Sequence, residues 1–136
     1  MTIRKFTGEW NKDLKWDGAR TRQYNNQVTE TWMIGKSEGA ENFAFRYYQL
    51  QPGGNSNLEQ HGYDHGVFVL HGSGEAMIRD MTHEISQGDI LHIAPDALHQ
   101  LRNTGEEVLG FLCVIPAKRQ KGGKTVWSEE GISFTE

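Results

Sequence analysis

The sequence predicts an all-β domain, built as a sandwich or a barrel. From residue 43 onward, short segments rich in aromatic and β-branched side chains are each bounded by Gly, Pro, Asn or Asp. These segments recur at intervals of about ten residues, which is typical of β-sandwiches and β-barrels. No stretch of useful length shows the apolar period of an amphipathic helix.

The expected core strands follow one another closely, because only short groups of turn-forming residues separate them. The more polar N-terminal part offers one further strand at residues 31–34. The expected core strands are residues 43–50, 67–70, 75–79, 90–93, 99–102 and 108–115.

We expect one domain over residues 1–136, with a barrel core at 43–115, an N-terminal extension at 1–40 and a C-terminal tail at 116–136. The tail is polar but carries a few spaced apolar side chains. We expect these to pack on the barrel or on a second subunit. They are Val126, Trp127, Ile132 and Phe134.

Composition excludes several classes of protein. A chain of 136 residues can bury a modest core without disulfides, and the single Cys113 suits a reducing compartment. The net charge is −4 and the basic residues are scattered, so the sequence shows no basic patch of the kind that binds nucleic acid. We see no charged-then-apolar leader and no apolar run near the roughly 20 residues of a membrane span. We therefore expect a cytoplasmic protein without nucleic-acid or membrane partners.

Glu59, His61, His65 and His99 are the candidate metal ligands. Three imidazoles and one carboxylate can hold a divalent transition metal while leaving coordination positions open. The first three residues share odd parity, so their side chains point to one face if their segment is extended. His99 must then come from a neighbouring strand.

These residues resemble the two conserved motifs of the cupin superfamily. The first motif, G-x5-H-x-H-x3-E-x6-G, is matched with its first His and its Glu exchanged, at Gly53, Glu59, His61, His65 and Gly72. The second, G-x5-P-x-G-x2-H-x3-N, is matched at Gly88, His99 and Asn103, with Ala94 at the Pro position and Asp96 at the Gly position. The chain is similar in this respect to the small, single-domain, metal-binding bacterial cupins.

The resemblance implies a cupin-type β-barrel, a jelly-roll form of double-stranded β-helix, that carries one divalent transition metal ion per chain. His61, His65 and His99 are implied ligands, whereas Glu59 either ligates or lies outside a three-His site. A carboxylate ligand favours Mn or Fe, and neutral imidazoles also tolerate Zn, Ni, Cu or Co.

Strand parity predicts the lining of a substrate pocket. Residues that alternate with His65 and His99, and one face of the last core strand, should point inward with the ligands. In the cupins that the chain resembles, the strand before the first motif also lines the cavity. An inward Arg46 would offer donors to a carboxylate, enolate or carbonyl oxygen, and an outward Arg46 would be solvated. The expected pocket residues are Arg46, Tyr48, Val67, Leu101, Phe111 and Cys113.

Other polar residues have ordinary structural interpretations. We expect His71, His83 and His92 to be surface or satisfied core residues and Asp64 to be solvated. Asn103 is expected to serve a turn, because Asn bonds locally and tolerates left-handed backbone.

The candidate site favours a metal-dependent enzyme acting on a small organic molecule, with the ion as Lewis acid or redox centre. Within that class the sequence favours an oxygen-dependent, dioxygenase-like oxidoreductase, followed by a non-redox isomerase, lyase or decarboxylase. Two alternatives are a non-catalytic domain that binds a small molecule and a structural metal that stabilises a dimer. We expect a homodimer, because a small barrel cannot fully cover the apolar residues of the terminal segments.

Overall fold

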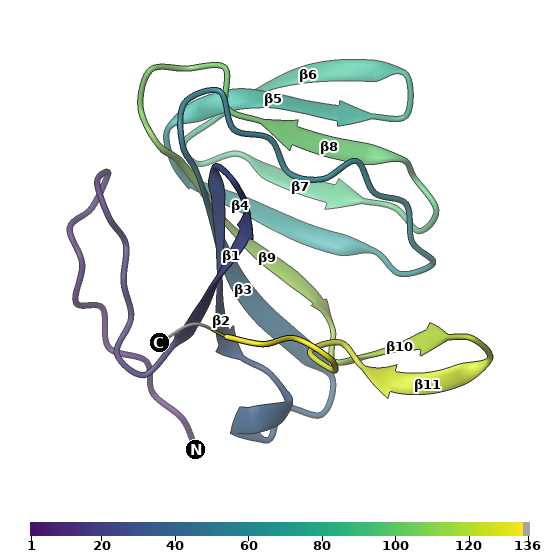
Figure 1. Ribbon diagram of the computed structural model, residues 1–136. Coiled ribbons are helices and arrows are strands. Elements are labelled where there is room, and N and C mark those ends of the chain that lie inside the picture. The colour runs from purple at the N-terminus through teal and green to yellow at the C-terminus, as the bar shows by residue number, and fades with distance from the viewer. Residues whose placement is uncertain (135–136) are drawn as a thin grey trace.

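The computed structural model describes residues 1–134, and its regular structure is almost entirely β-strand (Figure 1). The prediction of an all-β fold is confirmed. No α-helix occurs in residues 1–134, and η1 (Lys36–Glu38) is a single 3-10 turn. The strands are β1 (Arg20–Asn25), β2 (Val28–Ile34), β3 (Phe43–Leu50), β4 (His65–His71), β5 (Ser73–Ile78), β6 (Met81–Ser86), β7 (Ile90–Ile93), β8 (His99–Arg102), β9 (Leu109–Pro116), β10 (Lys118–Lys121) and β11 (Lys124–Trp127).

Across the described part of the chain, no helix is long and apolar enough to cross a membrane.

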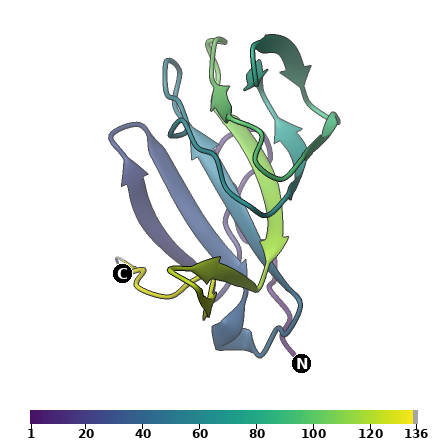
Figure 2. The same ribbon diagram turned by 90° about the vertical axis from the view of Figure 1, so that its right-hand side faces the viewer.

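Two antiparallel sheets enclose the interior. The larger has the strand order β1-β2-β3-β9-β4-β7, and the smaller has the order β6-β5-β8. The chain passes from one sheet to the other at Gly72, between β4 and β5, where φ is +83° and a Cβ atom would overlap the backbone at Val108. Figure 1 shows the small sheet lying over the β4 and β7 end of the large one, and Figure 2 shows β1 and β2 at the opposite edge.

The core lies between the inward faces of these sheets. Along β4, Val67 and Val69 are buried, while the intervening Phe68 is 41% exposed. Phe111 on β9 and Leu101 on β8 are buried in the same cluster. Burying one such side chain stabilises a fold by about 1.5 to 3 kcal/mol. The inward faces are therefore those that strand parity predicts.

The expected core strands are all present, but several other strands escaped prediction. Residues 31–34 prove to be the end of β2, and β1 pairs along it. β1 is an edge strand of mostly polar residues, and β6 is an edge strand whose single buried residue is Ile85. Edge strands bury one face weakly, so neither shows the apolar alternation on which the prediction depends. The large sheet thus also takes in residues from the expected N-terminal extension.

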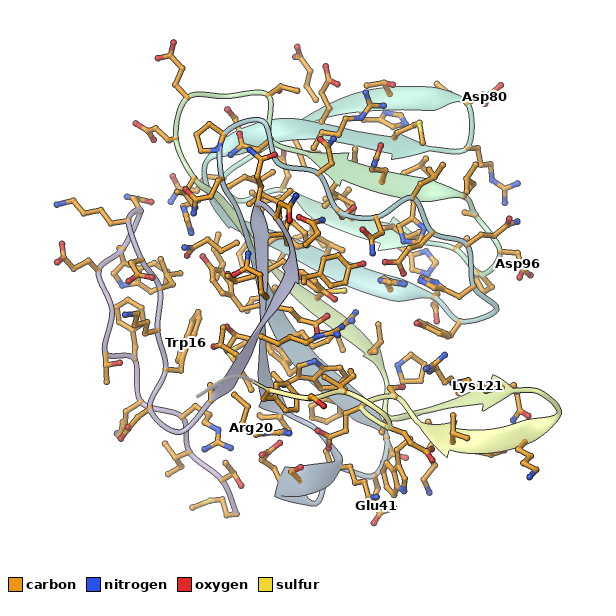
Figure 3. The ribbon with its side chains drawn as sticks, in the orientation of Figure 1. Trp16, Arg20, Glu41, Asp80, Asp96 and Lys121 are labelled. Atoms are coloured by element: carbon orange, nitrogen blue, oxygen red, sulfur yellow. The ribbon has the colours of Figure 1, made fainter. Side chains whose placement is uncertain are left out.

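The residues before β1 cover part of the outer face of the large sheet, around Tyr47 on β3. Leu14 and Trp16 pack there against Tyr47, with the Trp16 and Tyr47 rings meeting edge to face at 5.1 Å. Figure 3 shows Trp16 between this segment and the sheet. Behind this contact the Tyr47 hydroxyl lies 2.6 Å from His71 Nε2.

The tail packs on its own barrel. Beyond the β10 and β11 hairpin, Phe134 meets the buried Trp32 edge to face at 6.5 Å, and the Arg20 guanidinium lies 4.7 Å from the Phe134 ring. Glu129 accepts hydrogen bonds from Arg20 and from the backbone of Ser37. Of the two expected locations for the tail, the structure shows the barrel.

Candidate metal centre

The first motif reaches the site through a loop and not through a continuous strand. Residues 51–64 connect β3 to β4, and only isolated backbone bridges interrupt them: Asn55 with Arg102, and Glu59 with His99. Parity predicts Glu59, His61 and His65 on one face of an extended segment, but the chain bends at residues 62 and 63. The side chains converge because the loop is hydrogen-bonded to β8 and His65 opens β4.

Three histidines form a cluster at this point. One ligand atom from each of His61, His65 and His99 lies within 4.8 Å of the others. His61 Nδ1 and His65 Nε2 are 3.2 Å apart. His65 and His99 are buried, and His61 is half-buried.

Each imidazole has a partner for the nitrogen that would not bind a metal. His99 Nδ1 donates to the Ala97 carbonyl at 2.9 Å, and His65 Nδ1 lies 3.3 Å from the Cys113 sulfur. His61 Nε2 lies 2.8 Å from the Glu59 carboxylate. These contacts leave His99 Nε2, His65 Nε2 and His61 Nδ1 with lone pairs to offer.

Two facing lone pairs at 3.2 Å repel each other unless a proton or a cation lies between them. Burial and the positive charge of Arg46 lower the pKa of His65 to about 3, so this ring is neutral, as a metal ligand must be. The donor set therefore fits a divalent transition metal.

Glu59 holds His61 and lies outside the three-His group. Its carboxylate accepts hydrogen bonds from His61 and from the Tyr24 hydroxyl. Burial acts to raise the pKa of Glu59, but these hydrogen bonds outweigh it and lower the pKa to about 2. A carboxylate that fixes the orientation of a ligating His is a common outer partner of metal sites.

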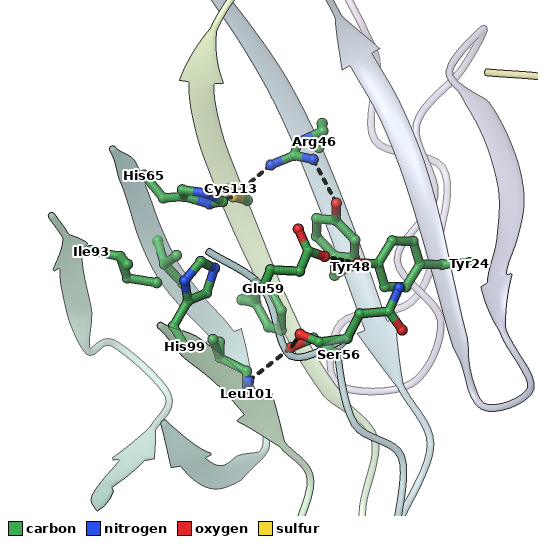
Figure 4. A pocket seen from close by; sticks show the side chains of 13 residues that line it. Tyr24, Arg46, Tyr48, Ser56, Glu59, His65, Ile93, His99, Leu101 and Cys113 are labelled. Carbon is green, nitrogen blue, oxygen red and sulfur yellow. Dashed lines mark hydrogen bonds between the residues drawn. The ribbon is translucent and has the colours of Figure 1, made fainter. Parts of the chain in front are cut away.

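A partly open cavity with a volume of about 30 Å³ adjoins the histidines (Figure 4). The structure brings the whole predicted pocket set to its wall, together with Glu59, His65 and His99. The predicted residues in the lining are Arg46, Tyr48, Val67, Leu101, Phe111 and Cys113.

Arg46 points inward, which decides between the two orientations considered from the sequence. Its side chain is 8% exposed. The guanidinium donates to the Tyr48 hydroxyl at 2.6 Å and to the Cys113 sulfur at 3.0 Å. Burial raises the pKa of the Cys113 thiol, although Arg46 acts against this.

Sequence reasoning missed Tyr24, Ser56, Asn57 and Ile93 in the cavity wall, and Glu30 behind it. Glu30 is 1% exposed and accepts hydrogen bonds from Trp32 and Arg22. One signal was available: Glu30 alternates with the apolar residues Val28 and Trp32, so it shares their inward face.

The remaining histidines lie outside the cluster, as expected. His71 is buried against Tyr47, His83 is exposed on β6, and the exposed His92 pairs with Asp64 at 2.8 Å. Asn103 serves a turn, since its amide nitrogen donates to the Leu50 and Glu107 carbonyls.

Comparison with known proteins agrees with this fold. A family model described as the cupin domain matches residues 46–115, and the chain belongs to the cupin family. The chain resembles two solved structures: a cupin-2 domain of Rhodospirillum rubrum (29% identity, TM-score 0.74, covering 91% of this chain and 84% of the other) and a cupin 2 conserved barrel domain protein of Rhodopseudomonas palustris (27% identity, TM-score 0.73, covering 88% and 83%).

A curated relative is 41% identical over 76 residues, which is 56% of this chain. It is the 1-methylthio-D-xylulose 5-phosphate methylsulfurylase of Rhodospirillum rubrum. The matched segment spans 49% of that protein's length.

Proposed function

We propose that this chain is a metal-dependent cupin enzyme that acts on a small organic molecule, with one divalent transition metal ion held by His61, His65 and His99. The observation that carries the proposal is the set of orienting contacts that turns one free nitrogen of each ring toward the cluster. Three protein ligands leave coordination positions open, which suits catalysis better than a closed structural site.

When bound, the ion would supply Lewis-acid polarisation of a substrate oxygen or, if it is redox-active, an electron-transfer centre. The chain's own residues orient the ligating rings and shield the site from water. Glu59 fixes the orientation of the His61 ring. Val67 and Phe111 form an apolar part of the cavity wall, and charges interact more strongly beside apolar groups than in water. If Glu59 turns inward to ligate, the site favours Mn or Fe. With Glu59 in its present position, the three imidazoles also suit Zn, Ni, Cu or Co.

Two reaction classes remain candidates. The apolar lining is compatible with the oxygen-dependent, dioxygenase-like oxidoreductase that the sequence favours. The methylsulfurylase relative, whose name gives a phosphorylated sugar derivative as its substrate, favours the other class considered, a non-redox lyase, isomerase or decarboxylase. A non-catalytic domain that binds a small molecule is the further alternative.

The proposal includes a homodimer in the cytoplasm. The tail packs on its own barrel, so its apolar residues no longer support a dimer. The support comes instead from exposed apolar residues on the outer face of the large sheet. Phe68 and Ile90 are paired across β4 and β7 there and are 41% and 77% exposed. Sedimentation in dilute buffer should show about twice the chain mass.

Metal analysis of protein purified without added metal tests the proposal. We expect about one transition metal ion per chain, and a steep loss of metal in His61→Ala, His65→Ala and His99→Ala, because each removes one of three bonds to the ion. His83→Ala, an exposed His on β6, is the control. Full metal content in all three ligand variants would show that the site is wrongly assigned.

The metal found then directs the activity screens. Oxygen consumption measured with an electrode during turnover would indicate the oxidoreductase, and undiminished turnover under anaerobic conditions would indicate the non-redox class.

A further inference from the structure

Arg46 is a buried cation whose hydrogen-bond donors are only partly used by the protein. Its Nη1 donates to the Tyr48 hydroxyl and its Nη2 to the Cys113 sulfur, neither of which is a carboxylate. Its Nε is buried and has no hydrogen-bond partner among the described residues. A buried guanidinium is costly unless its charge is paired and its donors are used.

The carboxylate that pairs with Arg46 is already shared. Glu30 Oε1 accepts from Arg22 Nε and from Trp32 Nε1, both at 2.7 Å. Glu30 Oε2 accepts from the Tyr48 hydroxyl and lies 3.6 Å from Arg46 Nη1. Arg22 and Arg46 therefore share the Glu30 carboxylate, and the pairing of Arg46 with it is loose, at 3.6 Å.

The Arg46 guanidinium lies beside the histidine cluster. The Cys113 sulfur contacts both Arg46 Nη2, at 3.0 Å, and His65 Nδ1, at 3.3 Å, so the guanidinium and the candidate ligand adjoin the same atom (Figure 4). Glu59, the other carboxylate of the cavity, is engaged by His61 and Tyr24.

We propose that Arg46 binds an oxyanion of the substrate, a carboxylate or enolate oxygen, next to the ion held by the three histidines. The inference rests on the proposed function and names its substrate class: a small organic molecule whose reacting end carries a negatively charged oxygen. The guanidinium supplies a planar fork of donors that matches a carboxylate.

The charges of the cavity wall favour a group with a single negative charge. Arg46 is the one arginine or lysine among the described lining residues, so the wall offers no second such cation for a phosphate dianion.

Acetate and acetamide are matched probes, because they have nearly the same shape and differ in charge. Their affinities are measured by calorimetry on the full chain loaded with one equivalent of zinc. We expect the unmodified protein to prefer acetate, and Arg46→Met to weaken acetate binding about 10- to 100-fold while acetamide binding changes little. Arg102→Met removes a half-buried guanidinium outside the cavity and should leave both affinities unchanged.

Zinc content and melting temperature are recorded on the same samples. If Arg46→Met does not fold, Arg46→Lys replaces it: lysine keeps the charge but not the fork, so acetate binding should fall by an intermediate factor. Unchanged acetate affinity in a folded, zinc-loaded Arg46 variant would overturn the inference. So would equal affinity of the unmodified protein for the two probes, no acetate binding, or tighter binding of phosphate. An unmodified protein that takes up neither zinc nor Mn, Fe, Ni, Cu or Co would overturn the proposed function itself, and metal analysis shows this before any probe is added.

Discussion

The backbones of Glu59 and His99 exchange two hydrogen bonds, from Glu59 N–H to the His99 carbonyl at 3.0 Å and from His99 N–H to the Glu59 carbonyl at 2.9 Å. This bridge fastens the loop that carries Glu59 and His61 to strand β8. The two motifs, far apart in the sequence, therefore meet through backbone bonds. Side-chain changes at Glu59 should consequently affect the ion more than the fold.

Replacing Glu59 by Gln distinguishes an outer partner from a direct ligand. In the observed arrangement the carboxylate only holds His61, so Glu59→Gln should weaken metal binding by about 10- to 100-fold, as is typical of outer partners. A direct carboxylate ligand would cost more for Mn and Fe, because an amide oxygen is a poorer donor to hard ions. Competition with a chelator of known affinity measures the change for Mn and for Zn. A much larger loss for Mn than for Zn would place Glu59 on the metal.

Gln100→Ala is a suitable control. Gln100 lies beside His99 on β8, and its amide donates to the Ser56 carbonyl without touching the cluster. Metal affinity in this variant should remain within a factor of a few of that of the unmodified protein.

The candidate site could be predicted largely from the sequence, because period-2 alternation and glycine spacing are local properties. Val67 and Leu101 were placed correctly by counting from His65 and His99. His61 reaches the cluster differently from the way this counting assumes, because the chain bends at residues 62 and 63.

The site residues that the sequence could not identify are those placed by tertiary contacts. Tyr24 lies on a polar edge strand, and nothing local indicates that its hydroxyl meets Glu59 across 35 positions of sequence. Glu30 alternates with Val28 and Trp32, but only the burial of β2 in the assembled sheet shows that this face lies in the core. Both residues carry polar groups where a core position would be apolar, and such exceptions are typical of functional sites.

Gly110 leaves the space in which Tyr47 and His71 meet. A Cβ atom at this position would overlap both His71 Nε2 and the Tyr47 hydroxyl. Gly110→Ala should therefore destabilise the protein by about 1 to 3 kcal/mol, as overpacking of a core does, and thermal unfolding should show a melting temperature lower by several degrees. Gly66→Ala is the matched control on the neighbouring strand, because its Cβ would meet open space. Equal melting temperatures for the two variants would mean that the side chains around Gly110 move aside for the added methyl group at little cost.

Glu129 should make the stability of the protein depend on pH in the acid range. Burial acts to raise the pKa of this carboxyl, but hydrogen bonds from Arg20 and Ser37 hold it below the ordinary value. A lowered folded-state pKa contributes stability above the unfolded-state pKa, and this is lost as pH falls through the folded-state value. The urea midpoint of the unmodified protein should therefore drop between about pH 5 and pH 3, and Glu129→Gln should start lower at neutral pH and show a shallower drop. Glu130→Gln changes the exposed neighbour, and its midpoint should follow the unmodified protein throughout. Parallel curves for Glu129→Gln and the unmodified protein would show that this carboxylate does not couple the tail to β1.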